Sequence, residues 1–101
     1  MKDTASENSR ILMDVIIARG VETIIISPGS RNTPLIIAAE AREKLKKYVV
    51  ADERTAAFMA LGMAMGSRRP VALACTSGTA LYNYAPAVAE AFYQKIPLIV
   101  I

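Results

Sequence analysis

The sequence predicts an α/β fold in which a parallel sheet carries helices on both faces. Short, continuous apolar runs rich in β-branched residues alternate along the chain with segments of helical period. These runs lack the polar alternation of a strand with one solvated face, so both faces of the sheet should be covered. With 101 residues, 53% of them apolar, the chain has the size and composition of one folded domain.

The chain is expected to begin with a helix and a strand. Thr4 and Glu7 have the spacing of a capping box, and Gly20 is a suitable residue to end the helix. The residues expected on its buried face are Ile11, Leu12, Val15, Ile16 and Ala18. A first strand then covers Thr23 to Ile26 and stops at the turn residues Ser27-Pro28-Gly29.

A second helix should start where Thr33, as N-cap, precedes Pro34 at the first helical position, and it should run to about Lys46. Basic residues near its end would complement the helix dipole; they are Arg42, Lys44, Lys46 and Lys47. The second strand is expected over Tyr48 to Ala51.

Asp52 is the expected N-cap of a third helix that ends near Gly66, and Val71 to Cys75 should form the third strand. The third helix has no polar face, which predicts that a second domain or subunit covers the side turned away from the sheet. The order of the strands in the sheet cannot be read from the sequence.

The last part of the chain should hold one more helix and strand. After Thr76-Ser77-Gly78 a helix is expected to run to about Gln94, with Pro86 marking a kink or a late start. Pro97 to Ile101 is the expected fourth strand. Because the chain ends on this apolar run, we expect residues 1–101 to be part of a longer protein.

Composition excludes several classes of function. The absence of histidine excludes a histidine-based triad or a histidine metal site within the chain, and no Asp or Glu cluster has metal-ligand spacing. Twelve basic and nine acidic residues leave a net charge of only +3, too little for a nucleic-acid surface. Neither a signal peptide nor a membrane span is evident, which predicts a cytoplasmic protein. Cys75, in an apolar run, should be a buried structural thiol.

Polar segments follow three of the expected strands: Ser27 to Thr33, Asp52 to Arg54, and Thr76 to Thr79. In a parallel sheet the carboxyl ends of the strands share one edge, where ligands bind. Glu53 stands out because it opens a helix made almost entirely of small and apolar residues. It is either an acid that stabilises the helix dipole or a buried carboxyl group that holds a proton.

The other two segments could also bind a ligand. Around Ser30 and Arg31, backbone N–H groups, hydroxyls and a guanidinium suit a carboxylate or phosphate, although an ordinary turn with Arg31 in solvent explains the pattern equally well. Gly78 would allow close backbone approach, and Thr79 and Asn83 offer hydrogen-bonding groups one helical turn apart. Their alternative interpretation is a helix cap.

Taken together, Ser27-Pro28-Gly29-Ser30-Arg31-Asn32-Thr33-Pro34-Leu35, Asp52-Glu53-Arg54 and Thr76-Ser77-Gly78-Thr79-Ala80 with Asn83 resemble the start of the thiamine diphosphate enzymes, in the domain that binds the aminopyrimidine of the cofactor. Within them the chain is most similar to the 2-succinyl-5-enolpyruvyl-6-hydroxy-3-cyclohexene-1-carboxylate synthases of menaquinone biosynthesis. The first segment and Thr79 select this family, because the related acetohydroxyacid synthases usually carry proline where Thr79 stands.

The resemblance implies a transferase that decarboxylates 2-oxoglutarate and adds the resulting carbanion to isochorismate. It implies that Glu53 is catalytic and binds the pyrimidine nitrogen, that Gly78, Thr79 and Asn83 lie beside the cofactor, and that Ser30 and Arg31 contact the substrates. Residues 1–101 would then be a partial, truncated N-terminal pyrimidine-binding domain of a larger multidomain enzyme. The full-length protein would be a homodimer or homotetramer.

The family binds magnesium and the diphosphate through a later domain, so the fragment alone is expected to be inactive. Two other interpretations stay open at this point. One is another thiamine diphosphate enzyme, such as an acetohydroxyacid synthase or a 2-oxoacid decarboxylase. The other is a non-catalytic α/β module whose carboxyl edge binds an anion or a protein.

Overall fold

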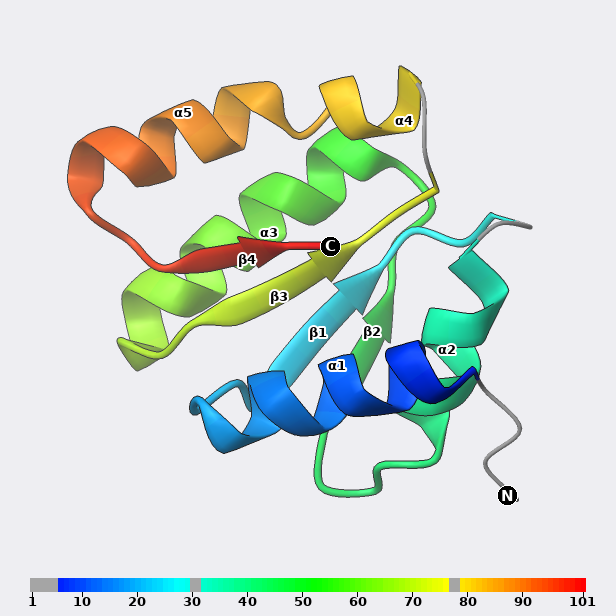
Figure 1. The fold of residues 1–101 in the computed structure, drawn as a ribbon. Coiled ribbons are helices and arrows are strands. Elements are labelled where there is room, and N and C mark those ends of the chain that lie inside the picture. The colour runs from blue at the N-terminus through cyan, green and yellow to red at the C-terminus, as the bar shows by residue number, and fades with distance from the viewer. Residues whose placement is uncertain (1–5, 30–31, 77–78) are drawn as a thin grey trace.

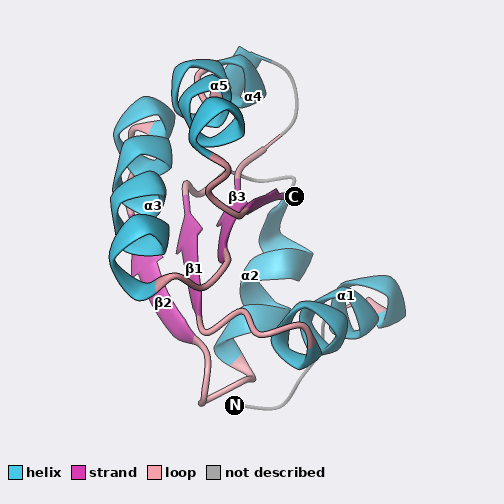
Figure 2. Cartoon of the chain, turned by 90° about the vertical axis from the view of Figure 1, so that its left-hand side faces the viewer, coloured by secondary structure: helices cyan, strands magenta, loops and turns pink. Residues whose placement is uncertain are grey.

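The computed structural model describes residues 6–29, 32–76 and 79–101. It forms three layers, with a central sheet between two groups of helices (Figures 1 and 2). The elements in chain order are α1 (Glu7–Ala18), β1 (Thr23–Ile26), α2 (Thr33–Glu40), β2 (Lys46–Val49), α3 (Glu53–Ser67), β3 (Val71–Ala74), α4 (Thr79–Tyr82), α5 (Ala85–Gln94) and β4 (Leu98–Val100). The predicted α/β fold with helices on both faces is confirmed.

The four strands are parallel and lie in the order β2-β1-β3-β4. Strand β1 is therefore central, and its partners align Ile26 with Val49 on one side and with Ala74 on the other. The pairing continues beyond the strands: the Ser27 N–H donates to the Ala74 carbonyl at 2.9 Å, and the Val50 N–H donates to the Ile26 carbonyl at 3.0 Å. The carboxyl ends of β1, β2 and β3 are thus held at one edge.

Each face of the sheet has its own core. Helices α1 and α2 cover one face, where Met13, Ile16, Ala38 and Ala39 pack on Ile24 and Ile26. Helices α3 and α5 cover the other face, which contains many small residues: Ala56, Ala57, Ala60, Ala64 and Ala87. Small side chains let helix and sheet backbones approach closely, and interiors packed in this way have no room for added volume.

The N-cap of helix α1 lies two residues after the predicted Thr4. Its N-cap is Ser6, whose side chain accepts a hydrogen bond from the Ser9 N–H, and Thr4 lies outside the described residues. Gly20, at φ +98°, follows the helix as predicted. The predicted buried face is wrong for Ile11 and Val15, which are 52% and 47% exposed, and for Ala18, which is also exposed.

The buried residues of α1 lie on a narrower stripe, comprising Ser9, Met13 and Ile16. These positions are separated by four and then three residues, so they form one line along the helix. The five residues predicted to be buried extend over a wider arc than the contact with the sheet and α2 can cover. Only this stripe is buried by packing, and the flanking side chains of Ile11 and Val15 are exposed to solvent.

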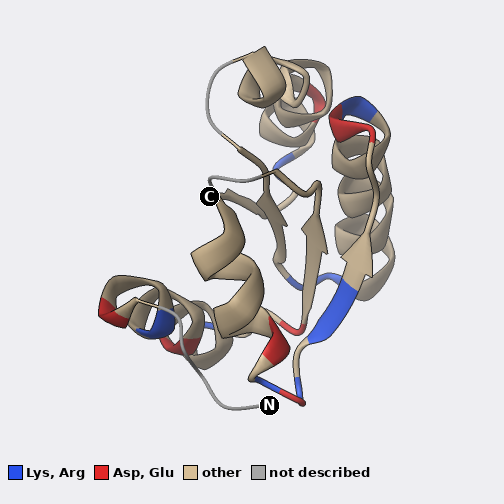
Figure 3. Ribbon diagram, turned by 90° about the vertical axis from the view of Figure 1, so that its right-hand side faces the viewer, with Lys and Arg blue, Asp and Glu red and all other residues tan. Residues whose placement is uncertain are grey.

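The predicted end of α2 near Lys46 is also wrong, because the helix stops at Glu40. Leu45 turns into the core, where it is 2% exposed, and the Lys46 N–H already donates to the Glu22 carbonyl at 2.9 Å. The second strand consequently begins at Lys46, earlier than Tyr48. Lys46 and Lys47 therefore lie in β2 (Figure 3), and only Arg42 of the basic cluster contacts a helix carbonyl, that of Ala38.

The other elements follow the predictions closely. Asp52 caps α3 through the Thr55 N–H, and the helix ends at Ser67. The fourth predicted helix is divided into α4 and α5, with Pro86 in the first turn of α5, so the alternative of a late start is correct. Cys75 is a buried free thiol, as predicted.

The tight packing of α3 can be tested at Ala60, which is fully buried against the sheet. In the intact protein, Ala60→Leu should lower the free energy of unfolding by about 1–3 kcal/mol, because the added carbons have no space. Ala18→Leu, at the exposed end of α1, should change it by about 0.5 kcal/mol at most. Urea denaturation measures both, and equal values for the two variants would contradict close packing at α3.

Candidate active site

The loop after β1 is anchored by Ser27. Its side chain is fully buried, and its hydroxyl donates to the Val50 carbonyl at 2.7 Å. Because its N–H bonds to Ala74, this one residue connects the ends of β1, β2 and β3. The position of every segment that leaves this edge of the sheet depends on that connection.

Asn32 closes the same loop. Its side-chain Nδ2 donates to the Ser27 carbonyl at 3.0 Å, and its Oδ1 accepts from the Gly29 N–H at 2.9 Å. The residue is 3% exposed, so both halves of a buried amide are satisfied. Ser30 and Arg31, the predicted substrate contacts, lie outside the described residues, but Gly29 and Asn32 on either side of them are fixed.

Gly29 packs against the loop that follows β3. A Cβ atom at this position would lie 2.8 Å from the Thr76 Cβ, closer than two carbons can approach. Glycine therefore lets the first and third loops of the carboxyl edge meet. Gly78, for which close backbone approach was predicted, lies outside the described residues.

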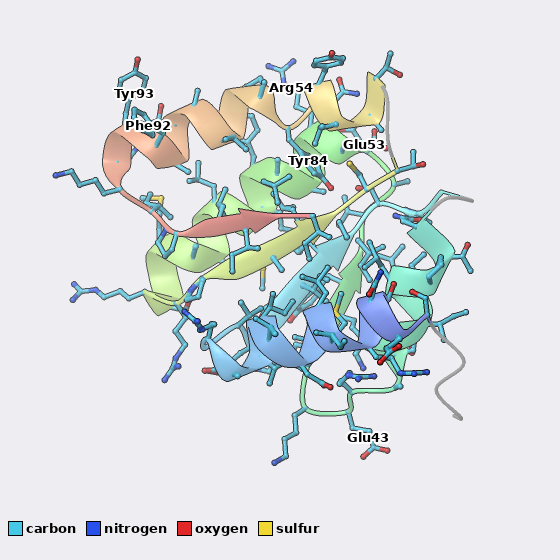
Figure 4. All side chains as sticks on the ribbon, viewed as in Figure 1. Glu43, Glu53, Arg54, Tyr84, Phe92 and Tyr93 are labelled. Carbon is cyan, nitrogen blue, oxygen red and sulfur yellow. The ribbon has the colours of Figure 1, made fainter. Side chains whose placement is uncertain are left out.

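Glu53 is the first residue of α3, at the same edge of the sheet (Figure 4). Capping is performed by its neighbour Asp52, whose Oδ2 accepts from the Thr55 hydroxyl at 2.6 Å and the Thr55 N–H at 2.9 Å. The side-chain hydrogen bond first, then the backbone one, lowers the pKa of Asp52. Among the described residues no hydrogen bond or ion pair engages the partly exposed Glu53 carboxylate.

Thr79 and Asn83 stand in α4 and just after it. Both are exposed, and the Asn83 side-chain amide donates to the Thr79 carbonyl at 3.4 Å. Their predicted separation of one helical turn is therefore correct. The Thr79 hydroxyl and the Asn83 Oδ1 are polar groups on the segment that follows β3.

Tyr84 was not predicted from the sequence as part of the site. It is 1% exposed, and its hydroxyl is the buried side-chain polar atom without a hydrogen-bond partner in the described part of the chain. Such a group costs about 1–3 kcal/mol relative to one that is paired. Burial first, then the Cys75 thiol, raises the pKa of Tyr84, so the phenol stays neutral.

One hollow of the described surface lies away from this edge of the sheet. Its volume is about 470 Å³, and it is lined by α1 and the segment that ends α2, including Asp14, Glu40 and Arg42. Within it Arg42 Nε lies 3.0 Å from the Asp14 Oδ1, so these two charges are paired. We place the candidate site at the carboxyl edge, where a carboxylate that has no partner among the described residues meets fixed loops.

We call the two hydrogen bonds of the Asn32 side chain, with the Ser27 carbonyl and the Gly29 N–H, the Asn32 brace. This brace predicts a specific loss of stability when Asn32 is replaced. Asn32→Asp should lower the free energy of unfolding by about 1–3 kcal/mol near neutral pH, because a carboxylate cannot donate to the Ser27 carbonyl. The deficit should shrink in acid, where a protonated Asp regains an O–H donor. Asn8→Asp, in the exposed first turn of α1, is the matched control and should be neutral or stabilising. Urea denaturation at two pH values checks this; equal effects at both sites would refute the brace.

The chain matches, over residues 7–101, the family model described as thiamine pyrophosphate enzyme, N-terminal TPP binding domain. Two similar proteins are 2-succinyl-5-enolpyruvyl-6-hydroxy-3-cyclohexene-1-carboxylate synthases. That of Porphyromonas gingivalis is 53% identical over 91 residues, 90% of this chain and 16% of that protein. That of Geobacillus kaustophilus is 52% identical over 101 residues, 100% of this chain and 18% of that protein. The chain thus spans less than a fifth of the length of these relatives.

The fold also matches a solved enzyme. The crystal structure of benzoylformate decarboxylase from Polynucleobacter necessarius superposes with a TM-score of 0.79 at 23% identity, covering 91% of this chain and 17% of that one. At this identity the likeness concerns the fold. Together with the match over residues 7–101, it places the chain in the family of N-terminal TPP-binding domains of thiamine pyrophosphate enzymes.

Proposed function

We propose that this chain supplies the pyrimidine-binding part of a thiamine diphosphate-dependent 2-succinyl-5-enolpyruvyl-6-hydroxy-3-cyclohexene-1-carboxylate synthase. The whole enzyme would decarboxylate 2-oxoglutarate and join the remaining unit to isochorismate. The identities of 53% and 52% to such synthases support this choice of reaction. The observation that carries the catalytic part is the Glu53 carboxylate, which has no hydrogen-bond or ion-pair partner among the described residues.

The groups at the carboxyl edge fit an aminopyrimidine. Such a ring offers nitrogen acceptors and an amino donor, and the edge offers a carboxyl group at Glu53, a hydroxyl at Thr79 and an amide at Asn83. Bound thiamine diphosphate would supply the electron sink for the carbanion. The role of Glu53 would be to hold a proton against a ring nitrogen, while the loops braced by Ser27 and Asn32 keep this edge in place.

Magnesium and the substrates need further residues. In the described part of the chain no three His, Cys, Asp or Glu side chains gather in a way that could hold a metal ion. We place the magnesium and diphosphate site in another part of the longer protein, and therefore expect this chain alone to be inactive. Ser30 and Arg31 are proposed to bind the carboxylates of the substrates, because they follow Gly29 in the braced loop.

The exposed side of α3 is proposed to pack against another domain or subunit of the same protein. Phe58, Met59 and Met65 are 43%, 36% and 50% exposed there. An apolar helix face that covers no part of its own core is typical of an interface.

A membrane span is a separate question. Within the described ranges, none of the helices has the length and apolar character needed to cross a membrane.

The proposed role of Glu53 predicts the effect of Glu53→Gln. In the full-length enzyme it should lower kcat at least about 100-fold, because glutamine cannot exchange a proton. Glu43→Gln is the matched control, since Glu43 is exposed at the opposite end of the molecule (Figure 4). The assay supplies 2-oxoglutarate and isochorismate. Wild-type turnover by Glu53→Gln would refute the catalytic role, and consumption of pyruvate in place of 2-oxoglutarate would refute the substrate assignment.

The proposed interface predicts the effect of Phe58→Asp. A charge buried in an apolar contact is strongly unfavourable, so the full-length variant should dissociate at concentrations where the wild type is oligomeric. Val15→Asp, exposed on α1 across the sheet, should leave the assembly intact. Sedimentation velocity at micromolar concentration measures both. A wild-type protein that is monomeric there would contradict a subunit interface on α3.

A further inference from the structure

Tyr84 has a hydroxyl that its packing does not require. The residue lies between α4 and α5 and is 1% exposed. Its backbone is satisfied, since its N–H donates to the Leu81 carbonyl at 3.1 Å and its carbonyl accepts from the Val88 N–H at 3.0 Å. The ring belongs to the core beneath α3 and α5, yet the hydroxyl has neither solvent nor a hydrogen bond of normal geometry. A phenylalanine would fill the same space without leaving a polar atom unpaired.

The surroundings of this hydroxyl come from all three loops of the candidate site. Ser27 follows β1, Cys75 follows β3, and Glu53 begins α3 after β2. After burial, the pKa of Tyr84 is raised by Cys75, lowered by Ser27 and raised least by the charge of Glu53. Figure 4 shows Tyr84 and Glu53 toward the same end of the sheet, with Tyr93 at the far end of α5. The buried hydroxyl is therefore at the point where the carboxyl ends of the strands converge.

Of these neighbours, Glu53 offers the strongest acceptor. The Ser27 hydroxyl, which donates to Val50, can accept only as a neutral oxygen, and a thiol such as Cys75 is a weak acceptor. A carboxylate is a strong acceptor, and a bond from a neutral hydroxyl to a charged group is about twice as strong as one between neutral groups. Burial raises the pKa of Tyr84, so the phenol keeps the proton that it would donate.

We propose that Tyr84 is a positioning residue for Glu53: in the cofactor-loaded enzyme its buried, unpartnered hydroxyl donates, directly or through one water, to the Glu53 carboxylate and sets its orientation. The inference rests on the proposed function, because it concerns the same carboxylate. In ligand-free enzymes catalytic hydrogen bonds are often long or poorly aligned, and they shorten in the complex. This accounts for the unpaired hydroxyl of Tyr84.

The titratable groups that face Tyr84 are the Cys75 thiol from β3 and the Glu53 carboxylate from α3. Asp52 and Arg54, beside Glu53, are exposed. Losing a donor makes a carboxylate bind its proton more tightly. Removing the Tyr84 hydroxyl should therefore move the acidic limb of the rate profile to higher pH.

The test compares full-length wild type, Tyr84→Phe, Tyr93→Phe and Glu53→Gln. Tyr84→Phe should lower kcat about tenfold and raise the midpoint of the acidic limb of kcat by about one pH unit. Its dissociation constant for thiamine diphosphate with excess magnesium, measured calorimetrically, should rise several-fold. Its melting temperature without cofactor should equal or exceed that of the wild type, because no partner is lost. Tyr93→Phe, 80% exposed, should match the wild type throughout.

The outcomes separate the inference from the proposed function. If Glu53→Gln is inactive while Tyr84→Phe keeps the wild-type pH profile and cofactor affinity, the inference is overturned and the function stands. A melting temperature several degrees lower for cofactor-free Tyr84→Phe would show a structural partner for the hydroxyl and would also overturn it. If Glu53→Gln keeps its turnover, the proposed function fails first, and Tyr84 loses its role with it.

Discussion

The arrangement of the candidate site depends on one buried residue, Ser27. Through its N–H and its hydroxyl it ties the end of β1 to the ends of β3 and β2, at 2.9 Å and 2.7 Å. The chain leaves this edge toward opposite faces of the sheet, to α2 after β1 and to α3 after β2. Three loops that are distant in sequence are thereby held together, and the Asn32 amide extends this order to the residues on both sides of positions 30 and 31.

A second constraint is the small size of the residues beneath α3. With alanine at positions 56, 57, 60 and 64, the helix lies close to β1 and β3, and its first turn reaches the edge where the loops meet. The large apolar residues of α3, Phe58, Met59 and Met65, are left on the outer side. The same sequence pattern thus explains both the position of Glu53 and the apolar surface that we propose as an interface.

Much of this could be predicted from the sequence, because the elements that matter most have simple signals. The buried strands are unbroken apolar runs, Asp52 is a typical N-cap, and a residue that follows a parallel strand must lie at the carboxyl edge. The end of α2 was missed because the residues up to Lys46 favour helix locally, whereas the burial of Leu45 and pairing with β1 decide the outcome. Strand order and the environment of Tyr84 depend on contacts between distant segments, which carry no local pattern.

The two acids at the start of α3 show how structure and function are divided between neighbours. Asp52 faces Thr55 and satisfies the helix terminus, and its bonds to that residue lower its pKa. Glu53 therefore takes no part in capping the helix. The Glu53 carboxylate has no structural partner in the described chain, and the buried Tyr84 hydroxyl has no hydrogen bond there either, so we propose that both act together on a further group. In the proposed enzyme that group is the pyrimidine, whose nitrogen would complete the hydrogen bonding that the chain leaves open.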